Sequence, residues 1–312
     1  MMTGRCDDNV ITLFNQHIIF SFMKKNLLLL AVLMVLPLVA AAYDFSAKNA
    51  DGVVIYYDLN KNGKDCSVTF NDDAKYKGMI AVPATVVYQG KTLQVTAIGP
   101  HAFEKCDNLY GVSLPEGIVR IEEDAFLGSE LMSDINFPST LKSIGNRAFS
   151  GCRFICANDE GLGNVELNEG LEEIGDGVFA RCYLMYRIVL PQSLKRIGQY
   201  AFLKCDALST IVLPENLEYI GMHAILSGLK NLVLPMNISA LQLGSVMPRR
   251  LEKLYSINPN PTAINGKDDI LSLFSDHIYE ETILMTPPEA VEKYKNTEGW
   301  KDFKHIEPWD LE

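Results

Sequence analysis

One phrase of about 23 residues recurs along the chain and limits what the chain can fold into. It takes the form I-G-x-x-A-F-x-x-C, followed by L-x-x-V-x-L-P. Neighbouring copies are offset by 23 residues, but the third copy reaches its leucine strand 7 residues late. Such self-similarity is typical of solenoids, in which each unit buries its apolar face against the next. The phenylalanines of five copies are Phe103, Phe126, Phe149, Phe179 and Phe202, and a shortened copy and a weakened copy follow.

Each part of the phrase predicts a local structure. The L-x-x-V-x-L stretch alternates apolar and open positions, which indicates a short strand with one buried face. The proline after it ends the strand because proline cannot donate to a ladder. The A-F-x-x-C stretch follows a glycine turn and is too short for a long helix, so we expect a single helical or 3₁₀ turn on the convex side. The sequence therefore predicts an α/β solenoid with a parallel sheet along one side.

Two copies of the phrase, IGPHAFEKCDNLYGVSLPEG and IGQYAFLKCDALSTIVLPEN, resemble the BspA-like leucine-rich repeat family of bacterial surface and secreted proteins. The resemblance extends from Tyr43 to Trp309 and implies a β-rich N-terminal cap over 43–94, leucine-rich repeats over 95–256 and a helical C-terminal cap over 257–312. It departs at Ser129, where cysteine is usual, in the insertion 153–163 and in the copies after Gly221. We expect the segment from Pro287 to start a helix and the last repeat to be covered by Trp300, Phe303 and Ile306.

The N-terminal segment predicts secretion. Residues 23–42 combine a basic start, an apolar run over 27–36 and three alanines over 40–42, the pattern of a signal peptide cleaved after Ala42. The apolar core is too short to span a bilayer comfortably. We therefore expect Met23 to be the start and residues 1–22 to be an upstream extension outside the protein. We expect the protein to be extracytoplasmic, at the cell surface or in the periplasm, with no membrane span after cleavage.

The cysteines of the repeats favour free thiols over disulfides. Equivalent side chains in stacked repeats point in parallel, whereas a disulfide requires its two Cβ vectors to converge. We therefore expect these residues to act as small buried hydrophobic groups. Cys66 and Cys156 lie outside the repeat position, and their pairing stays open. The repeat position holds Cys106, Cys152, Cys182 and Cys205.

No motif in the sequence indicates an enzyme, a cofactor or a metal site. The run from Asp58 to Gly63 resembles the start of a calcium loop, but Thr69 stands where an EF-hand needs a bidentate glutamate, and Asn62-Gly63 favours a hairpin turn. His101 and His223 share one variable repeat position and are expected on the surface. The net charge of −11 disfavours nucleic acid as a partner.

The open face of the leucine strands is the predicted contact surface. Along the strands, one outward row changes from polar to apolar halfway, which is typical of a protein-binding patch, although β-branched residues also suit strands in general. The insertion 153–163 is a second candidate, because a lengthened loop often projects from a solenoid. The candidate partner-binding residues are Tyr110, Asp134, Asn136, Tyr186, Arg187, Val189, Val212, Val233 and Tyr255.

The sequence favours a secreted protein that binds or adheres to another extracellular or cell-surface protein, as the family resemblance implies. One alternative is a glycan-binding protein that uses Tyr110, Asp134, Asn136 and Asn164. A second alternative is a structural surface component that associates with itself through an uncovered end of the solenoid.

Overall fold

The computed structural model describes residues 43–71, 75–157, 163–237, 246, 248, 250–267 and 272–309. The chain divides into two units, residues 1–41 and 42–312, and all described residues belong to the second. The predicted signal peptide and the upstream extension lie outside the described residues. In the described part, no helix combines the length and the apolar character needed to cross a membrane.

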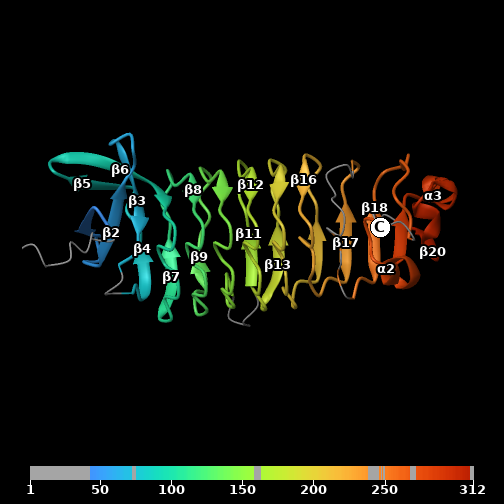
Figure 1. Cartoon of the computed structure of the whole chain (residues 1–312), viewed down its shortest axis with the longest axis horizontal. Helices are drawn as coiled ribbons and strands as arrows, with labels where there is room; N and C mark the ends of the chain where they lie inside the picture. The colour runs from blue at the N-terminus through green and yellow to red at the C-terminus, as the bar shows by residue number, and fades with distance from the viewer. Residues whose placement is uncertain are drawn as a thin grey trace, which may run out of the picture. The chain divides into compact units, whose positions relative to one another are not determined.

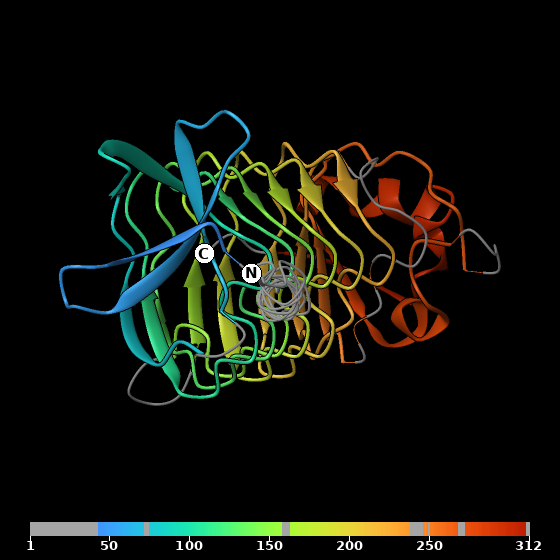
Figure 2. The ribbon, with the colours of Figure 1, turned by 60° about the vertical axis from the view of Figure 1, so that its left-hand side comes forward.

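The second unit winds as a solenoid in which successive repeats contribute one strand to each of two sides (Figures 1 and 2). On the first side, the isoleucine that precedes the repeat glycine pairs with the isoleucine of the next repeat, so that Ile121 lies opposite Ile144. We call this parallel arrangement the isoleucine sheet. Its repeat strands are β8 (Arg120–Ile121), β10 (Ser143–Ile144), β12 (Glu173–Ile174), β14 (Arg196–Ile197) and β16 (Tyr219–Ile220).

The isoleucine sheet explains the glycine of the repeat. The Gly145 amide donates to the Ile121 carbonyl at 2.7 Å, and equivalent bonds continue along the repeats. A Cβ atom on Gly198 would lie 2.4 Å from the backbone carbon of Gly175, which no real Cβ tolerates. The sequence predicts a sheet along one side of the solenoid, and the structure adds this second one.

The leucine strands form the other side, as the sequence predicts. We call the larger group the leucine sheet and the smaller group the short leucine sheet. A break separates them at the third repeat, where Ala157 and Gly163 form an antiparallel bridge. The parallel leucine sheet contains β11 (Gly163–Glu166), β13 (Met185–Val189), β15 (Thr210–Val212), β17 (Asn231–Leu234), β18 (Lys253–Ser256), β19 (Ile283–Thr286) and β20 (His305–Pro308). The short leucine sheet contains β4 (Gly78–Ala81), β7 (Leu109–Ser113) and β9 (Asp134–Ile135).

The A-F-x-x-C stretch forms two successive hydrogen-bonded turns in place of the expected helical turn. The Ala102 amide donates to the Gly99 carbonyl and the Glu104 amide to the His101 carbonyl, at 3.3 and 3.0 Å. A residue with positive φ stands where the two turns overlap, and it prevents a helix from continuing. The six residues at this position are His101, Asp124, Arg147, Gly177, Tyr200 and His223.

The phenylalanines of the repeats form a continuous stack through the core. Phe126 lies between Phe103 and Phe149, with its ring centroid 5.0 Å from each and interplanar angles of 6° and 10°. The stack continues through Phe179 and Phe202, and all five rings are fully buried. Rings repeated at this spacing remove a large apolar area from water in every repeat.

The repeat cysteines are free thiols, as predicted. Each thiol from the third copy onward donates to the phenylalanine carbonyl of the preceding repeat, as Cys152 does to Phe126 at 3.1 Å. The Ser129 hydroxyl makes the same contact with the Phe103 carbonyl at 2.6 Å. Serine can therefore replace cysteine at this position, because the position requires only a short side chain that donates one hydrogen bond. Cys66 and Cys156 are also free.

Antiparallel hairpins lie at the N-terminal end of the solenoid. The turn at Asn60 to Gly63 joins β2 to β3, as predicted, and the ring of Phe45 stacks on Tyr88 and Tyr57 at 4.3 and 5.1 Å. Tyr76 then packs its ring 4.7 Å from Phe103 and covers the first member of the stack. The strands of this region are β1 (Phe45–Lys48), β2 (Val54–Leu59), β3 (Asp65–Thr69), β5 (Thr85–Tyr88) and β6 (Lys91–Ile98).

The C-terminal region combines short helices with two strands that extend the leucine sheet. Trp300 and Phe303 are buried beside Phe274, and the Trp300 indole donates to the Thr262 carbonyl at 2.9 Å. Ile306 lies in β20 opposite Leu284, so it belongs to the sheet. The helical elements are α2 (Asp276–Glu281), η1 (Pro288–Ala290), α3 (Val291–Asn296) and η2 (Trp300–Asp302).

Truncation of one ring in the stack is expected to weaken the whole solenoid. Phe126→Ala removes a fully buried ring that touches two others, and we expect a loss of about 3–5 kcal/mol in the free energy of unfolding. Tyr110→Ala, which removes a ring that is 50% exposed, should change that free energy by roughly 0.5 kcal/mol or less. Urea unfolding followed by circular dichroism measures the free energy of unfolding of both variants. Equal losses in the two variants would contradict the view that the phenylalanine stack is the main support of the solenoid.

The buried thiols are expected to resist alkylation in the native protein. Burial raises the pKa of Cys106 to about 11 and that of Cys156 to about 12, and it raises those of Cys152, Cys182 and Cys205 further. At pH 8 these groups stay protonated, and a protonated thiol is a poor nucleophile. Iodoacetamide labelling, read by peptide mass spectrometry, should be slow in buffer and complete in urea. A disulfide-linked pair of peptides without reductant would contradict the free-thiol assignment.

Candidate partner-binding face

The apolar row predicted from the sequence lies on the outward face of the leucine sheet. Val212 is in register with Val233, and Val233 with Tyr255. Val189 enters the row beside Glu166. Val212 is 55% exposed, whereas the other three are half-buried. Strand alternation explains the arrangement, because the neighbouring residues Ile188, Ile211, Leu232 and Leu254 point inward and are buried.

A groove opens in this row between β13 and β15. These two strands share one registered pair, Arg187 with Thr210, and the Ser209 amide reaches the Tyr186 carbonyl only at 3.5 Å. The looser pairing coincides with a cavity of about 510 Å³, which forms the groove. Its lining residues are Tyr186, Arg187, Ile188, Val189, Leu190, Gln192, Ser209, Thr210 and Val212.

The groove offers two kinds of contact. Tyr186 is 45% exposed and Val212 is 55% exposed, so apolar side chains are open to solvent on both of its strands. Arg187 is exposed, and within the described residues no hydrogen bond or ion pair engages its side chain. A free guanidinium has five N–H donors for a carboxylate or a carbonyl group. The sequence identified these residues but not Gln192, which follows the strand-ending proline and carries no signal of its own.

The outward row continues beyond the predicted repeats. Met285 lies in register with Tyr255, and Glu307 lies in register with Met285. The Tyr255 ring meets Trp309 edge-on at 6.3 Å, and the buried indole nitrogen of Trp309 has no hydrogen-bond partner. The sequence analysis did not single out Met285, which is buried, or Trp309, which follows β20, because this part of the chain lacks the repeat phrase.

Tyr110, Asp134 and Asn136 lie on the short leucine sheet, across the break from the groove. The Asn136 side chain accepts from the Leu114 amide at 2.8 Å and donates to the Leu114 carbonyl at 2.7 Å. Its amide therefore continues the ladder beyond β9 and serves the fold. The break itself contains a cavity of 480 Å³ lined by Ser133, Asp134, Ile135, Asn136, Phe137, Cys156, Ala157, Asn164, Glu166 and Asn168.

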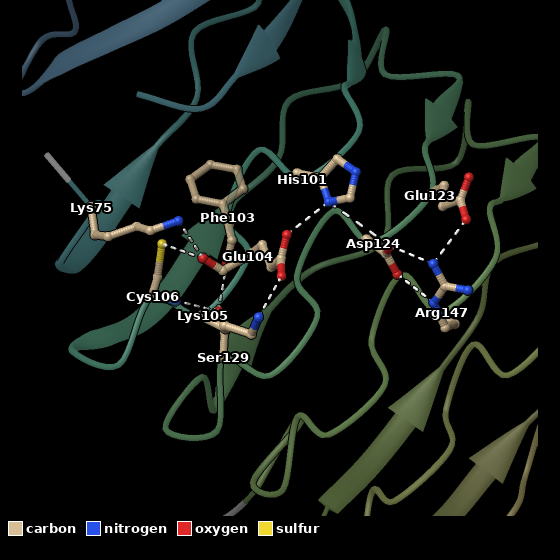
Figure 3. A network of polar contacts seen from close by, with 10 residues as sticks. All are labelled: Lys75, His101, Phe103, Glu104, Lys105, Cys106, Glu123, Asp124, Ser129 and Arg147. Carbon is tan, nitrogen blue, oxygen red and sulfur yellow. Dashed lines mark hydrogen bonds and ion pairs between the residues drawn. The ribbon is translucent and has the colours of Figure 1, made fainter. Parts of the chain in front are cut away.

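A polar network on the turn edge links the first repeats (Figure 3). Arg147 donates two hydrogen bonds to the buried Asp124 carboxylate, at 2.8 and 2.6 Å, and a third to Glu123. His101 lies 2.7 Å from Glu104 and 3.8 Å from Asp124. The contacts of Asp124 with His101 and Arg147 join successive repeats, so the network holds the turns of neighbouring repeats together. In the described part of the chain, no cluster of three or more histidine, cysteine, aspartate or glutamate residues suits a metal ion.

Two adjacent glutamates, Glu172 and Glu173, form ion pairs with the next repeat. Glu172 lies 2.9 Å from Lys195 and Glu173 lies 3.3 Å from Arg196, with all four side chains largely exposed. Exposed pairs of this kind contribute at most about 1 kcal/mol each. They lie on the isoleucine sheet side and have no part in the groove.

Comparison with known proteins identifies the repeats. Residues 96–158 and 156–247 match the BspA type leucine rich repeat region in 6 copies. No curated protein matches the sequence significantly.

Several solved structures are similar to this chain. A leucine-rich repeat protein from Bacteroides ovatus is 20% identical, over 86% of this chain and 77% of that one, with a TM-score of 0.42. The leucine rich repeat protein of T. pallidum is 26% identical, over 65% and 83%, with a TM-score of 0.45. A leucine rich cell surface protein from Faecalibacterium prausnitzii is 18% identical, over 86% and 95%, with a TM-score of 0.39. Through residues 96–247, the chain belongs to the BspA-type leucine-rich repeat family.

Proposed function

We propose that this protein binds another extracellular or cell-surface protein through the outward face of the leucine sheet. The observation that carries the proposal is the groove between β13 and β15, where exposed apolar side chains flank the unpaired Arg187. Leucine-rich repeat proteins are generally binding modules, and stacking of the repeats supports the strands that carry the groove.

The residue types of the groove suit a protein partner. Tyrosine and arginine are enriched among the residues that dominate binding energy in protein interfaces. Tyr186 and Arg187 stand at the groove, and the row from Val189 to Tyr255 supplies apolar area beside them. Because the strands fix the backbone before binding, the entropy lost when a partner docks comes mainly from the exposed side chains. A partner with an apolar ridge and a nearby carboxylate would complement this surface.

The proposed location is outside the cytoplasm. The expected signal peptide over 23–42 supports export, and a similar protein from Faecalibacterium prausnitzii is described as a leucine rich cell surface protein. We infer that adhesion to a surface protein is the use of the groove.

Charges introduced into the row should abolish protein binding. The triple variant Val189→Asp, Val212→Asp and Val233→Asp places three carboxylates where the partner's apolar side chains would pack. Against a panel of purified extracellular-matrix and cell-surface proteins in biolayer interferometry, we expect at least one saturable interaction that weakens tenfold or more in this variant.

A matched triple variant controls for the added charge. Met79→Asp, Val87→Asp and Met222→Asp change exposed apolar residues that lie outside the row, and they should leave the interaction intact. Equal binding by the wild type and the row variant would remove the groove as the contact site.

A second candidate is the binding of a neutral glycan at the break in the leucine strands. The 480 Å³ cavity there brings together Asp134, Asn164 and Glu166, whose oxygen atoms accept hydrogen bonds from sugar hydroxyl groups. On a glycan array, the double variant Asp134→Ala and Asn164→Ala should lose binding that Val212→Asp retains. An array without any signal for the wild type would discard this candidate.

A further inference from the structure

A third cavity, separate from the groove and from the break, spans four successive repeats. It has a volume of 480 Å³. Tyr183 contributes from the fourth copy of the phrase, Lys204 and Asp206 from the fifth, Ser227 from the sixth and Arg250 from the weakened seventh. No sequence pattern drew attention to these residues, because they occupy variable positions next to the repeat cysteine. We call this cavity the Lys204 pocket.

Two cations of the Lys204 pocket lack a counter-charge. Within the described residues, no ion pair or hydrogen bond engages the Lys204 ammonium or the Arg250 guanidinium, although Asp206 lines the same pocket. Several other exposed cations of the repeats are paired, as Lys195 is with Glu172 and Lys230 with Glu252. In a chain with a net charge of −11, two unpaired cations in one pocket form a local anion-binding field.

A change in the repeat phrase opens the Lys204 pocket. Gly228 stands where the preceding copies have Cys205 and Cys182, and a Cβ atom there would lie 2.5 Å from the Asp206 carbonyl oxygen. The glycine lets the sixth repeat lie against Asp206 and leaves no side chain beside Ser227. Ser227 is 5% exposed, and its buried hydroxyl has no hydrogen-bond partner. A buried hydroxyl is normally satisfied, so Ser227 has unused hydrogen-bonding capacity at the wall of this pocket.

The remaining groups favour a sugar over a simple anion. Asp206 is an acceptor for hydroxyl groups, which a plain carboxylate or phosphate lacks. Tyr183 is 38% exposed and offers a ring face against which the C–H bonds of a pyranose can pack. We propose that the Lys204 pocket binds an acidic sugar residue, either a uronic acid or a sialic acid, whose carboxylate lies between Lys204 and Arg250. The Ser227 hydroxyl, which also lines the pocket, then donates to an oxygen atom of the sugar.

Titration calorimetry on the full chain tests this assignment with four probes: glucuronic acid, N-acetylneuraminic acid, glucose and acetate. We expect saturable binding of one of the two acidic sugars, and the one that binds identifies the source. Glucose and acetate should bind at least tenfold more weakly, because glucose lacks the carboxylate and acetate lacks the sugar ring with its hydroxyl groups. A higher salt concentration should weaken the binding of the acidic sugar, since exposed cations hold its carboxylate.

Variants at matched repeat positions separate a site from a general charge effect. Lys204→Ala and Arg250→Ala should each weaken binding fivefold or more, and Ser227→Ala should weaken it about threefold while keeping both cations. Arg181→Ala is the control, because Arg181 occupies the same turn position as Lys204 one repeat earlier, with φ of 63° against 58°, but does not line the pocket. Saturation by neither acidic sugar, equal affinity for glucose or acetate, or an equal loss in Arg181→Ala would overturn the proposal.

Discussion

The face-to-face stack of buried phenylalanine rings is the contact on which the remaining structure depends. Ring centroids follow one another at 5.0 to 5.9 Å from Phe103 to Phe202, a spacing compatible with the hydrogen-bonded strands of both sheets. The thiol or hydroxyl at the cysteine position then ties each repeat to the phenylalanine carbonyl of the one before. Since every repeat contacts mainly its neighbours, the stack transmits order along the solenoid without long-range loops.

Much of this arrangement could be predicted from residue types and spacing. The alternation in L-x-x-V-x-L predicts the leucine strands, and their common register places Val212, Val233 and Tyr255 in one row. The equivalent positions of the cysteines predict parallel side chains and hence free thiols. In each case a short-range pattern repeats in every unit. A copy in which the pattern is weak can therefore be interpreted from the copies in which it is clear.

Other features carry no periodic signal and had to come from the structure. The repeat strands of the isoleucine sheet are two residues long, which is too short for an alternating pattern to be visible. The glycine after them is needed because the backbone of the neighbouring repeat leaves no room for a Cβ atom. The left-handed turn position accepts His101, Asp124, Arg147 and Tyr200 alike, so its conformation cannot be read from residue type. The groove depends on how far β13 and β15 separate, which is a property of two strands together and of neither sequence alone.

In such a solenoid, function is expected where a repeat departs from the common phrase. A regular repeat satisfies its own backbone and buries its own apolar groups, so it presents a uniform ribbon with little to distinguish one ligand from another. Two of the cavities described above follow departures of this kind, the insertion of the third repeat and Gly228 in the cysteine position. The groove arises instead where two regular repeats pair loosely, at β13 and β15. The phenylalanine stack passes beneath the loosened strands without interruption, since Phe179 and Phe202 remain 5.9 Å apart. The core therefore tolerates variation at the surface, and neighbouring repeats are free to acquire different ligands.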